Sequence, residues 1–190
     1  MRIVFIGPPG AGKGTQAQRL IQAYRMAHLS TGDMLRAARD AETDVGRQAE
    51  PYMSAGTLVP DDVIMAIIAQ RLTEPDCRQG YLLDGFPRTI VQAQALDALL
   101  AQQRTPLHAV LELQVAEEEL LRRLAGRGRT DDNPEVIRQR LVAYRQQTEP
   151  LLKYYAQRGL LRSIDGLGTV DEIFARARVV LDQVAGWAPR

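Results

Sequence analysis

The sequence has little cysteine, little lysine and no long apolar run. Its single cysteine, Cys77, excludes an internal disulfide and a zinc site made of several cysteines, and we expect a neutral thiol near a loop. The longest apolar run, 63–69, is far too short to span a bilayer. A net charge of +1 provides no overall field that would attract nucleic acid or an anionic membrane. Since no charged and then apolar leader opens the chain, a cytosolic protein is expected.

The chain does have a regular alternation of apolar segments and helical patterns. Five short apolar segments are each predicted to form a strand: 2–6, 26–29, 81–84, 109–113 and 160–164. The helical patterns between them predict an α/β fold of three layers, in which helices cover both faces of a five-stranded parallel sheet. Residues 39–59 are polar and weakly periodic, which predicts a small helical insertion. Pro51 is expected to start or kink a helix there.

A glycine-rich loop follows the first predicted strand and precedes a helical pattern, with four glycines in eight residues. Glycines let backbone N–H groups converge on an anion, and the next helix adds a positive dipole end. In such a loop Lys13 would contact the β- and γ-phosphates, and the Thr15 hydroxyl could bind Mg²⁺. The usual pattern places Ser or Thr directly after the lysine, whereas here Gly14 intervenes.

The scarcity of lysine supports this interpretation of the loop. The chain has 22 arginines and only two lysines, Lys13 and Lys153. A lysine kept within the loop indicates a position where the planar guanidinium group is not tolerated. The alternative, a glycine-rich turn that binds nothing, does not account for it, so nucleotide binding is predicted.

Further polar residues are candidates for a metal site and a second anion site. Asp84 ends a predicted strand, where ligands of parallel sheets gather, and its carboxylate would suit Mg²⁺ held through water. The alternative is an Asp that caps a helix. Thr31, Arg36, Arg88 and Gln92 could hold a second phosphate and a base edge, because arginine binds phosphate bidentately and an amide both donates and accepts. Taken singly, each is more often an ordinary surface residue.

Six arginines fall within nineteen residues in the second half of the chain. Arg127 and Arg129 lie in the segment Gly126–Arg127–Gly128–Arg129–Thr130, which suits a lid that neutralises the charge on a phosphoryl group in transfer. Arg122 and Arg138 are expected on a solvated face. Nucleic-acid binding is disfavoured, because acidic residues are adjacent and no aromatic residues are interleaved for stacking.

Together these motifs resemble those of adenylate kinases with a short lid, and the resemblance covers nearly all of the chain. It is carried by the segments 7–15, 28–33, 56–61, 84–88 with Gln92, and 129–132 with Arg140. Five motifs in order are far more specific than one glycine loop. The glycine before Thr15 is itself the form that nucleoside-monophosphate kinases have.

The resemblance implies the reaction ATP + AMP ⇌ 2 ADP with Mg²⁺, and no zinc, because the lid lacks cysteine. It implies an AMP-binding insertion at 30–59 and a lid at 126–136, on a core of 1–29, 60–125 and 137–190. The residues implied to bind ATP are Gly10, Ala11, Gly12, Lys13, Gly14, Thr15, Arg127 and Gly168. Those implied to bind AMP are Thr31, Arg36, Thr57, Leu58, Val59, Gly85, Phe86, Pro87, Arg88, Gln92, Arg129 and Arg140. Those implied to act on the transferred phosphoryl group are Lys13, Asp84, Arg88, Arg123, Arg127, Arg129 and Arg140.

The acceptor itself removes the need for a general base. An AMP phosphate is largely dianionic at neutral pH, since its second pKa is about 6. His28 and His108 are therefore assigned to packing in a strand and in a loop. A monomer is expected, with a frayed end at 186–190.

Two other functions remain as alternatives. A UMP/CMP kinase is the nearest, but Thr31 and Thr89 favour adenine, because pyrimidine-specific relatives tend to carry Ala and Asn at these places. A non-catalytic nucleotide-binding module is disfavoured, because binding alone does not require Asp84 and the paired lid arginines.

Overall fold

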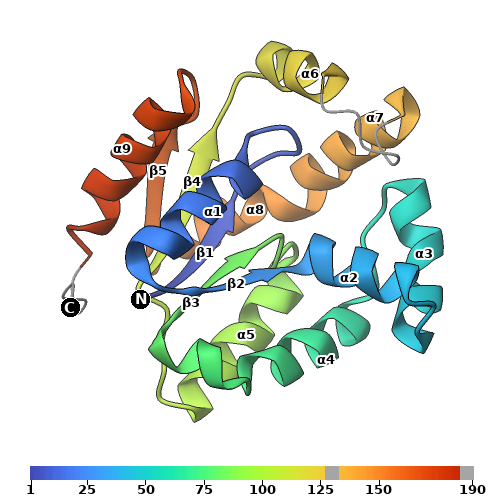
Figure 1. Ribbon diagram of the computed structural model, residues 1–190, viewed down its shortest axis with the longest axis horizontal. Coiled ribbons are helices and arrows are strands. Elements are labelled where there is room, and N and C mark those ends of the chain that lie inside the picture. Colours follow the sequence, from blue (N-terminus) through green and yellow to red (C-terminus); the bar gives the residue numbers. More distant parts are fainter. Residues whose placement is uncertain (127–132, 185–190) are drawn as a thin grey trace.

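The computed structural model describes residues 1–126 and 133–184, and within them the predicted parallel sheet is confirmed. Its five strands lie in the order β2-β3-β1-β4-β5, and every neighbouring pair is parallel (Figure 1). Because β1 lies between β3 and β4, the strand order reverses beside it, which is where ligands of such sheets bind. The strands are β1 (Arg2–Ile6), β2 (Ala27–Ser30), β3 (Tyr81–Asp84), β4 (Ala109–Gln114) and β5 (Leu161–Asp165).

Helices cover both faces of the sheet in the described residues, and no helix there is long and apolar enough to cross a membrane. A short 3₁₀ segment, η1 (Pro75–Gln79), lies between α4 and β3, and a π segment, η2 (Tyr144–Thr148), joins α7 to α8. The α-helices are α1 (Lys13–Tyr24), α2 (Thr31–Asp40), α3 (Asp44–Ala55), α4 (Asp61–Leu72), α5 (Ile90–Gln102), α6 (Glu117–Ala125), α7 (Pro134–Ala143), α8 (Pro150–Ala156) and α9 (Val170–Leu181).

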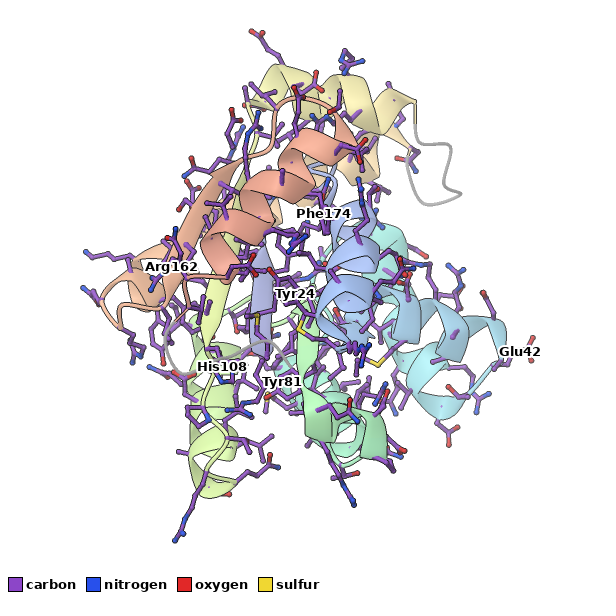
Figure 2. All side chains as sticks on the ribbon, turned by 60° about the vertical axis from the view of Figure 1, so that its left-hand side comes forward. Tyr24, Glu42, Tyr81, His108, Arg162 and Phe174 are labelled. Atoms are coloured by element: carbon purple, nitrogen blue, oxygen red, sulfur yellow. The ribbon has the colours of Figure 1, made fainter. Side chains whose placement is uncertain are left out.

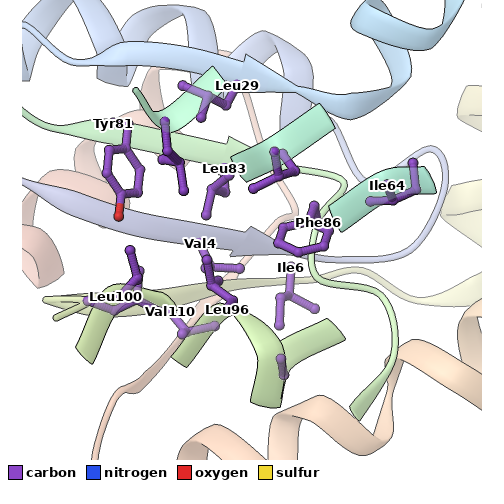
Figure 3. Packing of buried hydrophobic residues seen from close by; sticks show 14 of the residues in the cluster. Val4, Ile6, Leu29, Ile64, Tyr81, Leu83, Phe86, Leu96, Leu100 and Val110 are labelled. Atoms are coloured by element: carbon purple, nitrogen blue, oxygen red, sulfur yellow. The ribbon is translucent and has the colours of Figure 1, made fainter. Parts of the chain in front are cut away.

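The core has two parts, one on each face of the sheet. Successive side chains of a strand point to opposite faces, so β1 contributes Val4 and Ile6 to one part and Ile3 and Phe5 to the other. The first part packs against α4, α5 and α8, and Figure 3 shows a portion of it. The second packs against α1, α6 and α9, the side on which Figure 2 labels Tyr24 and Phe174.

Side-chain caps set several helix boundaries. Asn133 caps α7, since its side chain accepts the N–H of Val136 at 2.9 Å. Thr169 and Glu172 form a capping box at the start of α9. The π segment η2 lies between α7 and α8, and Pro150 is the first residue of α8. Burial raises the pKa of the Cys77 thiol to about 11, so the expected neutral thiol is confirmed.

Of the two expectations for Pro51, that it starts a helix is wrong, because it lies inside α3. Thr43 begins this helix instead, because its hydroxyl accepts the N–H of Gly46 at 3.1 Å. A proline seven residues beyond the start removes one backbone donor, and the rest of the helix continues around it.

Gly46 allows α2 and α3 to approach each other closely, and Gly46→Ala is expected to destabilise the protein by about 1–3 kcal/mol. A Cβ at this position would lie 2.2 Å from the backbone oxygen of Ala38. Gly14→Ala is the matched control, since nothing lies within 4 Å of a Cβ at that helical glycine. Urea unfolding monitored by circular dichroism would compare the two variants, and equal stabilities would contradict the expectation.

Candidate active site

One cavity of about 720 Å³ lies at the carboxyl ends of the strands and brings together segments that are distant in the sequence. It is lined by the glycine loop after β1, the start of α2, the connection between α3 and α4, the segment after β3, and parts of α6 and α7. The predicted site residues that line it are Gly10, Gly12, Lys13, Gly14, Thr15, Thr31, Arg36, Thr57, Leu58, Val59, Asp84, Gly85, Pro87, Arg88, Gln92, Arg123 and Arg140.

Three predicted site residues in the described part of the chain do not line this cavity. Ala11 belongs to the glycine loop but is fully buried, and Phe86 belongs to the apolar core shown in Figure 3. Gly168 lies in the connection between β5 and α9. Arg127 and Arg129 lie outside the described residues, as does the chain end expected to fray.

The glycine loop passes directly into α1, and no side chain caps this helix. Its first N–H groups are therefore available to an anion. Lys13 folds back over the loop, and its Nζ donates to the backbone oxygens of Gly7 at 2.7 Å and Pro8 at 3.0 Å. Gly10 has a φ of 84°, and a Cβ there would lie 2.8 Å from Leu124. The loop thus requires glycine where α6 packs against it.

Arg123 joins the loop to two other segments. Its Nε donates to Glu119 at 2.6 Å, its Nη1 to the oxygen of Ala11 at 3.1 Å, and its Nη2 to the oxygen of Gly166 at 2.9 Å. Hydrogen bonds from Arg122, and then from Arg123, lower the pKa of Glu119 to about 2. The expectation for Arg122 is confirmed, because its side chain is 74% exposed. Arg123 therefore holds a positive charge beside the loop.

Three arginines, Arg36, Arg88 and Arg140, line the same cavity as this loop. Burial lowers the pKa of Arg88, the charges of Arg140 and Arg36 lower it further, and Asp84 acts in the opposite direction. An arginine stays protonated in proteins, so three like charges around one cavity favour an anionic ligand. Arg88 is held in place, since its Nε donates to the oxygen of Gly85 at 2.8 Å. These groups are a candidate second anion site in the cavity that the loop also lines.

Thr31 and Gln92 are both buried beside these arginines. The hydroxyl of Thr31 donates to the oxygen of Gly85 at 2.9 Å. The Oε1 of Gln92 accepts the N–H of Arg88 at 2.7 Å. Both side chains line the cavity, where a ligand could reach them.

The two histidines have different environments. His108 packs as expected, since its Nδ1 accepts the N–H of Arg2 at 2.9 Å. His28 instead lines the cavity, with its Nε2 3.6 Å from an oxygen of Asp84. Sequence reasoning missed this contact, because it depends on β2 and β3 being neighbours in the sheet. The nearest signal was the position of each residue close to the end of a predicted strand.

Asp84 and Thr15 are the residues that could hold a metal at the cavity. Asp84 is buried and Thr15 is exposed, and both line the cavity. One carboxylate and one hydroxyl fit Mg²⁺, which keeps most of its water and binds through a few protein ligands together with substrate phosphates. Across residues 1–126 and 133–184, no group of three or more His, Cys, Asp or Glu side chains is arranged to hold a metal.

Comparison with known proteins identifies the family. The family model described as adenylate kinase matches residues 5–160. A protein named adenylate kinase from Stenotrophomonas maltophilia (strain K279a) is 53% identical over 93% of this chain and 96% of its own length. Another from Thermobifida fusca (strain YX) is 51% identical over 95% and 98%. A third, from Nitrobacter winogradskyi, is 51% identical over 95% and 93%. The chain therefore belongs to the adenylate kinase family, enzymes that transfer a phosphoryl group between ATP and AMP.

Proposed function

We propose that the two anion sites of the cavity divide the substrates of ATP + AMP ⇌ 2 ADP between them. Residues Gly10 to Thr15, with Arg127 and Gly168, bind ATP. The residues around the second site bind AMP. The observation that carries this division is that Arg36, Arg88 and Arg140 influence one another and line the same cavity as the glycine loop. The AMP residues are Thr31, Arg36, Thr57, Leu58, Val59, Gly85, Phe86, Pro87, Arg88, Gln92, Arg129 and Arg140.

In this proposal the protein aligns two anions and screens their repulsion. Lys13 and the backbone N–H groups hold the triphosphate, while the arginines bring the AMP phosphate into line with the γ-phosphate. The attacking phosphate oxygen is already ionised, so no residue has to remove a proton. Residues 30–59 act as an AMP-binding insertion and 126–136 as a lid, and their closure excludes water from the reaction.

Mg²⁺ is the cofactor in this proposal, with Thr15 binding it directly and Asp84 through water. When bound, the ion neutralises charge on the β- and γ-phosphates. The proposal includes no structural zinc, and it describes a monomer in the cytosol. The single cysteine supports the cytosolic location, because proteins of that compartment rarely rely on disulfides.

Single-turnover measurements with AMP, UMP and CMP as acceptors test this function. AMP is expected to react fastest, since Thr31 and Thr89 favour adenine over pyrimidines. Faster turnover of UMP would favour the UMP/CMP kinase alternative. Binding of ATP with no ADP formed from AMP would favour a non-catalytic module.

A further inference from the structure

The side-chain amide of Gln92 is held at both ends by protein groups. Its Oε1 accepts the N–H of Arg88, and its Nε2 donates to Oδ1 of Asp61, each at 2.7 Å. A backbone N–H can only donate, and an ionised carboxylate can only accept. These two partners therefore fix which end of the amide carries the oxygen, although the side chain, only 2% exposed, faces the cavity.

We propose that Asp61 is a positioning residue for base selection. Its carboxylate holds the amide of Gln92 in the orientation that suits a 6-aminopurine rather than a 6-oxopurine. After its two protein bonds the amide still has one N–H and one lone pair. Adenine offers an acceptor at N1 and a donor at its 6-amino group, whereas hypoxanthine offers a donor at N1 and an acceptor at O6. An inverted amide would present its donor and acceptor in the opposite order and favour the oxopurine. This inference rests on the AMP site proposed above.

Asp61 acts through Gln92 and does not line the cavity. It is the first residue of α4 and is partly buried. The hydroxyl of Thr89, which caps α5, lies 3.3 Å from its second oxygen. Both carboxylate oxygens thus face α5, and the carboxylate is held with one oxygen toward the amide of Gln92.

The test compares kcat/KM for AMP and for inosine monophosphate, each with ATP. Asp61→Ala is expected to lower the preference for AMP about tenfold, through a higher KM for AMP, because one hydrogen bond to a charged group is lost. The KM for ATP should not change. Asp61→Asn should keep most of the preference, since its Oδ1 can still accept from Gln92 while its Nδ2 faces the Thr89 hydroxyl.

Asp62→Ala is the matched control, because this exposed neighbour carries the same charge in the same turn of α4. An unchanged preference in Asp61→Ala, or an equal loss in Asp62→Ala, would overturn the inference. The variant Gln92→Ala distinguishes a failure of this inference from a failure of the proposed function. If Gln92→Ala alone lowers the preference, only the role of Asp61 is wrong. If Gln92→Ala has no effect on AMP, the assignment of the AMP site fails too.

A second measurement does not depend on the stability of Asp61→Ala. In ¹H–¹⁵N spectra of the wild-type protein, one side-chain amide proton of Gln92 should be protected from exchange by its bond to the carboxylate. Its signal should shift in Asp61→Asn. Rapid exchange of both protons, or an unchanged signal, would overturn the inference.

Discussion

Lys13→Arg is expected to lower kcat for ADP formation at least about 100-fold, although the charge is conserved. The ammonium group of Lys13 fits within the loop, where it donates to the oxygens of Gly7 and Pro8. A guanidinium group is wider and planar, so it cannot occupy the same position and also approach a phosphate as a point charge. Steady-state assays at saturating ATP and AMP would measure the loss.

Lys153→Arg is the matched control for this substitution. Lys153 is the only other lysine of the chain, and it is exposed on α8. The control should keep wild-type activity. Full activity of Lys13→Arg would show that a guanidinium group is tolerated at position 13, contrary to what the scarcity of lysine in the chain indicates.

Arg88→Ala is expected to lower kcat/KM for AMP by about 10²–10³-fold and to leave the affinity for ATP nearly unchanged. Arg88 lines the cavity together with Arg36 and Arg140, and in the proposed AMP site its removal takes away a positive charge beside the acceptor phosphate. Burial and the charges of Arg36 and Arg140 disfavour the charged form of Arg88 in the folded protein. Removing this side chain should therefore not unfold the protein, and the loss of activity should reflect the loss of its charge. Calorimetric titration with each nucleotide separately would measure both affinities.

Arg138→Ala controls for the loss of one arginine, since the side chain of Arg138 is 73% exposed. It should leave both affinities as they are in the wild-type protein. If Arg88→Ala weakened ATP as much as AMP, the division of the cavity into two substrate sites would be wrong.

Much of this architecture could be predicted from local sequence. Strand β1 and the glycine loop follow from a short apolar run, closely spaced glycines and the start of an amphipathic helix. The caps at Asn133 and Thr169 follow from short spacings. Such features depend on residues a few positions apart, so a linear pattern is sufficient to find them.

Contacts between distant segments could not be predicted in this way. The contact of His28 with Asp84 requires β2 to lie beside β3. The hydrogen bond between Gln92 in α5 and Asp61 in α4 joins residues that are 31 positions apart in the sequence. The Arg123 bonds to Ala11 and Gly166 span 112 and 43 positions. No local pattern encodes these pairings, because each depends on how whole elements pack.

The place of β1 in the sheet has an evolutionary consequence. This strand is the middle one of the five and is paired on both sides, so the loop at its end rests on the interior of the sheet. The edge strand β2 leads instead into α2, which carries Arg36, and then into α3. Under the proposed division of the substrates, selection for a different phosphate acceptor can change the elements at the edge of the sheet without changing the loop proposed to bind the phosphate donor.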